Sequence, residues 1–197
     1  MESSKDMINK ANYKVIIVGS AGSPNVAVNL LKINEKLNIP VIICIHFTSS
    51  AMETFANHIE IETGHIVKIV DQPTPIKNEI YLPKGGKDII FISENTLNSV
   101  ESEYKVHPSI SKLFESLVKY ADDKTTIIVL GGLGDDGKDY AKILRNKGVK
   151  FVIEKSPRFP YLPNNIAKEL EMRYEQAEQS RIKDIIIRIN RQALQDY

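Results

Sequence analysis

Residues 13–19 of this 197-residue chain have the sequence YKVIIVG, an apolar run rich in valine and isoleucine and closed by glycine. A run with so few polar interruptions predicts a strand buried on both faces, as in the centre of a parallel sheet. Three later runs have the same character, namely PVIICIH at 40–46, TTIIVLGG at 125–132 and VKFVIE at 149–154. We therefore expect four central strands.

Helical patterns separate these strands. Apolar residues recur at spacings of three and four in segments that begin near Ser23-Pro24, Met52, Ile110, Asp136 and Ser180. Because strands alternate with helices, we predict an α/β protein with a doubly wound, mostly parallel sheet and helices on both faces.

The stretch EIYLPKGGKDIIFIS at 79–93 departs from this rhythm. Two strand-like runs are joined there by Lys84-Gly85-Gly86-Lys87, which predicts an antiparallel hairpin at an edge of the sheet. We find no internal repeat, low-complexity block or Pro/Gly linker after residue 12. We expect a flexible N-terminal tail over 1–12, followed by a single domain over 13–197.

The composition, 42% hydrophobic and 26% charged, is that of a soluble globular protein. The 26 Lys and Arg against 25 Asp and Glu give a net charge of +1, which argues against a nucleic-acid binder. No apolar run approaches the roughly 20 residues of a membrane span. The polar start MESSKDMINKAN is not a secretory signal, and the single Cys44 cannot form an internal disulfide. We expect a cytoplasmic protein.

Residues with chemical potential follow three of the predicted strands. Gly19–Ser23 (GSAGS), with Ser20, follows the first, His46 ends the second, and Gly131–Gly137 (GGLGDDG) follows the third. The carboxyl ends of parallel strands meet at one edge of a sheet, where ligands collect. A serine needs a base to become a nucleophile, histidine can supply it, and a carboxylate can orient the histidine. This composition suits acyl transfer.

Each of these features also has a structural interpretation. A Gly/Ser loop before a helix can be a tight turn, or a cradle for a phosphate or nucleotide. A histidine at a strand end can be a satisfied structural residue. Asp135 or Asp136 can serve as the N-cap of the next helix. The placement of all three after parallel strands favours the acyl-transfer interpretation over any single alternative.

In these loops the chain resembles the CheB family, the protein-glutamate methylesterases of bacterial chemotaxis. VIIVGSAGS at 15–23 is similar to the family's strand and Gly-Ser loop, and VIICIHFTSS at 41–50 to its strand ending in histidine. LGGLGDDG at 130–137 is similar to its acidic loop. The resemblance covers nearly all of residues 13–190 and also includes NEIYLPKGGKDIIF at 78–91, HPSISKLF at 107–114 and FPYLP at 159–163.

The resemblance implies the Rossmann-like fold of the methylesterase domain and a catalytic triad. Its members here are Ser20 as nucleophile, His46 as base and Asp136, rather than Asp135, as the acid. We assign backbone N–H groups near Ala21 and Leu133 to oxyanion binding. The implied reaction is hydrolysis of glutamate γ-methyl esters on the cytoplasmic domains of chemoreceptors, together with deamidation of glutamines. No metal or organic cofactor is required.

Several residues differ from the family pattern. Ser23-Pro24 follows where a second glycine is usual, Gly131 replaces a threonine, Leu133 a methionine and His107 an arginine. These changes motivate an alternative, a catalytically weakened CheB-like binding or adaptor module. Twelve polar residues cannot supply the family's receiver domain, so we expect a free-standing catalytic domain that is either constitutively open or controlled by a separate regulatory protein.

Overall fold

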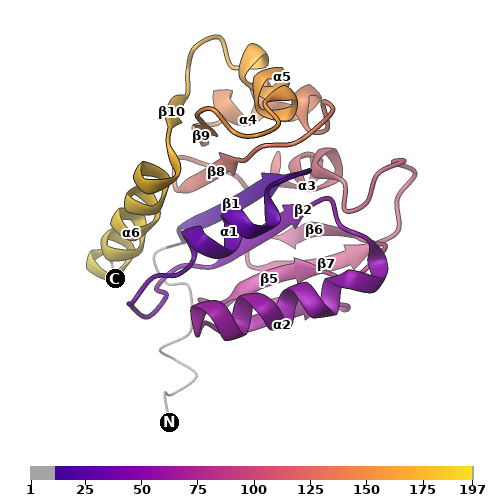
Figure 1. Cartoon of the computed structure of the whole chain (residues 1–197), viewed down its shortest axis with the longest axis vertical. Helices are drawn as coiled ribbons and strands as arrows, with labels where there is room; N and C mark the ends of the chain where they lie inside the picture. Colours follow the sequence, from indigo (N-terminus) through magenta and orange to yellow (C-terminus); the bar gives the residue numbers. More distant parts are fainter. Residues whose placement is uncertain (1–11, 197) are drawn as a thin grey trace.

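The computed structural model describes residues 12–196, which form a seven-stranded sheet, a three-stranded sheet and six α-helices. The strands are β1 (Lys14–Gly19), β2 (Val41–Ile45), β3 (Val67–Val70), β4 (Thr74–Pro75), β5 (Ile80–Pro83), β6 (Asp88–Ser93), β7 (Thr96–Val100), β8 (Thr125–Val129), β9 (Lys150–Glu154) and β10 (Glu175–Ala177). The helices are α1 (Pro24–Leu30), α2 (Met52–Thr63), α3 (Ile110–Leu117), α4 (Lys138–Asn146), α5 (Tyr161–Glu169) and α6 (Gln179–Gln195). Figure 1 shows their arrangement.

The main sheet has the strand order β10-β9-β8-β1-β2-β5-β3, and every pair in it is parallel. The chain moves from β1 toward β2 first, and returns later to the other side of β1 as β8. The order of connection therefore reverses between β1 and β8. In open α/β sheets, ligands bind outside the carboxyl ends of the strands at such a switch point.

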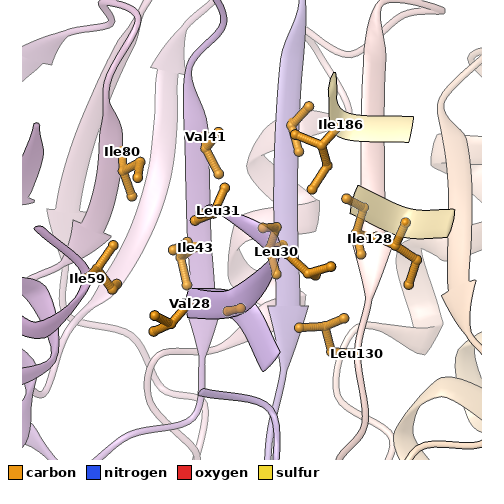
Figure 2. Packing of buried hydrophobic residues seen from close by; sticks show 14 of the residues in the cluster. Val28, Leu30, Leu31, Val41, Ile43, Ile59, Ile80, Ile128, Leu130 and Ile186 are labelled. Atoms are coloured by element: carbon orange, nitrogen blue, oxygen red, sulfur yellow. The ribbon is translucent and has the colours of Figure 1, made fainter. Parts of the chain in front are cut away.

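The sheet is buried on both faces. Along β1, Val15 and Ile17 pack into one core, while Ile16 and Val18 pack into the other. Helices α1, α2 and α6 cover the first face, where Leu30 of α1, Ile59 of α2 and Ile186 of α6 pack against the strands (Figure 2). Helices α3, α4 and α5, with the small sheet, cover the second face. Apolar side chains on both faces explain why the strand sequences show no polar alternation.

The four predicted central strands and the doubly wound, mostly parallel sheet are confirmed. The predicted hairpin within 79–93 is wrong. Its first run, β5, is fully buried and lies between β2 and β3 in the parallel sheet. Its second run, β6, pairs antiparallel with the following β7, in a separate sheet of order β4-β7-β6. The two runs therefore belong to different sheets, and Lys84–Lys87 connects these sheets.

Helix α4 begins later than the sequence indicated, and helix α6 begins earlier. Helix α4 starts at Lys138 after Gly137, whose φ is +90°, so Asp136 lies in the preceding loop and is not the N-cap. Helix α6 starts at Gln179 with Glu178 as its N-cap, in place of the expected Ser180. The predicted tail over 1–12 lies outside the described residues, apart from Asn12. None of the helices in residues 12–196 is long and apolar enough to cross a membrane.

Candidate active site

Ser20 and His46 come together because they directly follow two adjacent strands. The register of β1 and β2 pairs Gly19 with Ile45, and the His46 N–H donates to the Gly19 carbonyl at 3.2 Å. On the other side of β1, the Ser20 N–H donates to the Gly131 carbonyl at 3.0 Å. The backbone hydrogen bonds of the sheet thus continue by one residue beyond β1 and β2 and by two residues beyond β8.

The side chains form a continuous chain of contacts. The Ser20 Oγ lies 3.1 Å from His46 Nδ1, and His46 Nε2 lies 2.8 Å from Asp136 Oδ2. The ring is connected in the opposite sense to chymotrypsin-type triads, where Nε2 faces the serine. This sense follows from the fold: His46 sits beside Ser20 on the next strand, so the nearer Nδ1 meets Ser20 and the farther Nε2 extends to Asp136.

The Asp136 carboxylate is held by the N-terminus of helix α3. The Ile110 N–H donates to Oδ2 at 2.7 Å and the Ser111 N–H donates to Oδ1 at 2.8 Å. The Ser111 hydroxyl also accepts from the Gly137 N–H at 2.8 Å, which ties the loop of Asp136 to the helix. Free N–H groups at a helix start favour negative charge. Burial acts to raise the pKa of Asp136, but the hydrogen bonds from His46, Ile110 and Ser111 outweigh it and lower the pKa.

Two glycines after β8 are required by close approach. A Cβ atom on Gly132 would lie 2.5 Å from the Cβ of Ser20, so the backbone of this loop packs directly against the serine. A Cβ on Gly131 would lie 2.8 Å from the Cβ of Pro157. The glycine that stands in place of the family's threonine therefore leaves room for the segment 157–159. That segment in turn accepts the Gly132 N–H at the Phe159 carbonyl, at 2.8 Å.

The backbone donors nearest the serine divide into engaged and free groups. The N–H groups of Ser20 and Gly132 are engaged by carbonyls, and the Ser23 N–H donates to the Ser20 carbonyl at 3.1 Å. The Ser23 hydroxyl donates to the same carbonyl at 2.5 Å and makes no side-chain cap bond to α1. Within residues 12–196, the N–H groups of Ala21, Gly22 and Leu133 have no hydrogen-bond partner. Two of these three, Ala21 and Leu133, are the donors that the sequence had suggested for oxyanion binding.

A second histidine–aspartate pair, His107 and Asp88, lies next to the start of α3. His107 Nδ1 lies 2.8 Å from Oδ1 of Asp88, whose side chain is fully buried. Asp88 also accepts the Ser109 N–H at 2.7 Å and the Ser102 hydroxyl. Three successive N–H groups at 109–111 are thus divided between two carboxylates, Asp88 and then Asp136. This cluster fixes the end of α3 that holds Asp136.

Sequence reasoning found Ser20, His46 and Asp136, and the structure brings all three within hydrogen-bonding distance. It missed the groups that support them, which are Ile110, Ser111 and Asp88. Ser109 offered a signal, since a serine before an apolar helical pattern is a common N-cap, and its side chain does accept the Lys112 N–H at 3.0 Å. Asp88 offered none, because its partners lie 14 to 21 positions away in the chain.

A parallel α/β sheet with serine, histidine and aspartate in contact at its switch point is an arrangement typical of serine hydrolases. Comparison with known families agrees: the sequence matches the CheB methylesterase family over residues 15–186. The chain belongs to the CheB methylesterase family.

Curated relatives have names that agree with this family. The chain is 25% identical over 173 residues to protein-glutamate methylesterase/protein-glutamine glutaminase 3 of Vibrio cholerae, covering 82% of this chain and 48% of that protein. It is 30% identical over 168 residues to the protein-glutamate methylesterase/protein-glutamine glutaminase of Lawsonia intracellularis, covering 77% and 46%. The chain therefore spans about half the length of these relatives.

A solved structure has the same fold. The crystal structure of the Thermotoga maritima CheB methylesterase catalytic domain aligns with a TM-score of 0.77 and 16% sequence identity, covering 90% of this chain and 98% of the other.

Proposed function

We propose that this protein is a serine hydrolase that removes methyl groups from glutamate γ-methyl esters of chemoreceptors and deamidates selected glutamines. The observation that carries the proposal is the unbroken contact chain from Ser20 through His46 to Asp136. Family membership and the names of the relatives support the substrate class. On this proposal, the domain over 13–197 acts in chemotaxis signalling in the cytoplasm.

Acylation would begin at the Ser20 hydroxyl. Its oxygen attacks the γ-carbonyl carbon of the ester while His46 Nδ1 takes the proton, and the N–H groups of Ala21 and Leu133 receive the negative oxygen that forms. His46, now protonated, is stabilised by the ionised Asp136. Collapse of the intermediate breaks the bond to the methoxy oxygen, which takes the proton from His46 and leaves as methanol.

Deacylation would repeat these steps with water as the nucleophile. His46 removes a proton from water, the hydroxide attacks the ester between Ser20 and the glutamyl group, and His46 returns the proton to Ser20. The products are a glutamate carboxylate and the free serine. A glutamine substrate follows the same route, with ammonia in the place of methanol.

The surroundings of Ser20 suit a protein substrate. Leu133 and Tyr161 are exposed by 50% and 59%, and the Leu162 N–H joins their two segments by donating to the Gly132 carbonyl at 2.9 Å. The Phe159 ring comes within 3.2 Å of where a Cβ on Gly22 would lie, beside the serine loop. Apolar side chains around a nearly buried hydroxyl favour a substrate that presents one ester from a broad surface, such as a receptor helix.

The alternative, a weakened adaptor module, rests on the unusual residues Gly131, Leu133 and His107. The hydrogen bonds that join Ser20, His46 and Asp136 are intact beside all three. Gly131 contributes its backbone carbonyl, which any residue would have, and His107 keeps a partner in Asp88. The hydrolase is therefore the better supported function.

The direct test is methanol release from a methylated receptor cytoplasmic fragment. We expect Ser20→Ala to lower kcat by several orders of magnitude, about 10⁴-fold or more, with an unchanged thermal unfolding curve. Ser50→Ala, which replaces an exposed serine in the short 3₁₀ helix Ser49–Ala51, is the matched control and should keep full activity. Equal methanol release by Ser20→Ala and the parent protein would refute the assignment.

A further inference from the structure

A cavity of about 550 Å³ lies at the opposite edge of the main sheet, at the amino ends of the strands. It is bounded by Tyr13 before β1, Thr126 of β8, residues 150–152 of β9, the segment 173–175 and helix α6. Helix α6 lies toward the start of β1 in Figure 1, away from the tip of its arrow. The six residues of β1, at about 3.3 Å each, put roughly 20 Å between this cavity and Ser20.

Positive charge dominates the lining of the cavity. The basic lining residues are Arg145 on α4, Lys150 on β9, Arg173 before β10 and Arg188 on α6. The acidic lining residue is Glu175, and its Oε1 lies 3.3 Å from Nε of Arg181, outside the cavity. Within residues 12–196, none of the four basic side chains forms an ion pair with a carboxylate. Arg173 also interacts with the Glu171 carboxylate at longer range. In a chain whose total charge is +1, four cations without a contact ion pair around one cavity still favour an anionic ligand.

Two of the arginines have guanidinium N–H groups that are free to donate to such a ligand. Arg145 Nε donates to the Arg173 carbonyl at 2.9 Å, which anchors the Arg145 guanidinium while its terminal nitrogens stay available. Arg173 Nε is buried and has no hydrogen-bond partner among the described residues. Buried donors are almost always paired in folded proteins, so an unpaired one at a cavity wall points to a missing acceptor. Guanidinium groups bind phosphate through parallel N–H donors.

The rest of the lining is apolar. Ile185 and Ile189 of α6, Val152 of β9 and the ring of Tyr174 face the same space. β10 pairs only with residues 152–154 of β9, so the first part of β9 lies open to the cavity on that side. A volume of this size is in the range of small-molecule sites, which combine apolar walls with a few polar anchors.

We propose that this cavity binds a phosphate-bearing small molecule of nucleotide size, with the phosphates on the arginines and the apolar body against α6. The basis is the coincidence of a cavity, four cations without a contact ion pair and one buried unpaired guanidinium nitrogen. The proposal does not depend on Ser20 or on hydrolysis.

Calorimetric titration of the full chain with ATP, inorganic pyrophosphate and adenosine tests this proposal. We expect ATP and pyrophosphate to bind and adenosine to bind much more weakly, since the phosphates supply most of the affinity. Lys150→Gln and Arg188→Gln replace exposed side chains and should each weaken ATP binding about tenfold, because each removes a charge-assisted contact. Arg173→Gln should weaken it at least as much.

Lys183→Gln is the matched control, since it removes the same charge from α6 at a position outside the cavity lining. It should leave ATP affinity within about twofold. Absence of ATP and pyrophosphate binding at millimolar concentration would overturn the proposal. So would equal losses in Lys183→Gln and Arg188→Gln, or adenosine binding as tight as that of ATP. Ser20→Ala should bind ATP like the parent, which separates this result from the test of the hydrolase.

Discussion

Two histidine–aspartate pairs lie on either side of the start of helix α3, and they have the same separation of 2.8 Å. His46 joins Asp136 to a serine hydroxyl, so the three groups form a line along which a proton can move. Around Asp88, His107, Ser102 and the Ser109 N–H all converge on one carboxylate. The Ser102 hydroxyl donates to the acid and so cannot be activated by the histidine. Both clusters contain a serine, a histidine and an aspartate, and only the connectivity of Ser20, His46 and Asp136 matches the proposed catalytic role.

The largest expected difference between the clusters is in the histidines. His46→Gln should lower kcat for methyl-ester hydrolysis by about 10⁴-fold or more, because no base remains for the serine proton. His107→Gln can still donate to Asp88 and should keep activity within about tenfold. The measurement is the rate of methanol release by each variant at the same concentration of folded protein. Equal losses would mean that the two clusters form one catalytic unit.

The aspartates should separate activity from stability. Asp136→Asn should lower kcat by about 10³ to 10⁴-fold, since an amide cannot stabilise the protonated His46. Asp88→Asn should instead lower the free energy of unfolding by about 2 to 3 kcal/mol, because a buried acceptor of three hydrogen bonds loses its charge. Denaturant titration and initial rates on both variants distinguish the effects. A reversed pattern would place the essential acid at Asp88.

The pH dependence gives a smaller effect, about tenfold in rate per pH unit on the acid side. The proposed reaction requires a neutral His46 ring, because an imidazolium cannot accept the serine proton, so the rate should fall toward low pH. The lowered pKa of Asp136 keeps its carboxylate ionised well below neutral pH. Its folded-state pKa lies below the unfolded value of about 3.9, so its stabilising contribution is complete above about pH 4 and is lost as the pH falls further.

Rates and circular dichroism over the same pH series check this order of events. Activity should be lost with a one-proton slope while the protein remains folded. His107→Gln should leave the acid limb of the profile in place. A two-proton slope that becomes a one-proton slope in His107→Gln would show that the second histidine participates.

The parts of the fold that could be predicted were those encoded by short local patterns. The strands β1, β2, β8 and β9 are buried on both faces, and the uninterrupted apolar runs at 13–19, 40–46, 125–132 and 149–154 indicated this directly. The stretch 79–93 could not be assigned in the same way. Its two strands differ in partner and in sheet, and pairing depends on residues far along the chain, such as those of β2 and β3.

In the candidate site, too, only the residues that a local sequence pattern marks could be predicted. Ser20, His46 and Asp136 each follow a strand, so the topology rule for parallel sheets was enough to bring them to one edge. The backbone donors of Ile110 and Ser111 carry no sequence signal, because every residue other than proline has an N–H group. The Asp88 cluster and the arginine-lined cavity both assemble residues from distant segments, which a pattern of local spacing cannot reveal.

The proposed function requires that Ser20, and not Ser102, is activated by a histidine. Reaction of the parent protein with a fluorophosphonate probe, followed by mass spectrometry of the labelled peptides, distinguishes the two serines. We expect one label on Ser20, lost in His46→Gln and retained in His107→Gln. A folded protein that takes up no label, or that is labelled at Ser102 and not at Ser20, would show that the assignment is wrong.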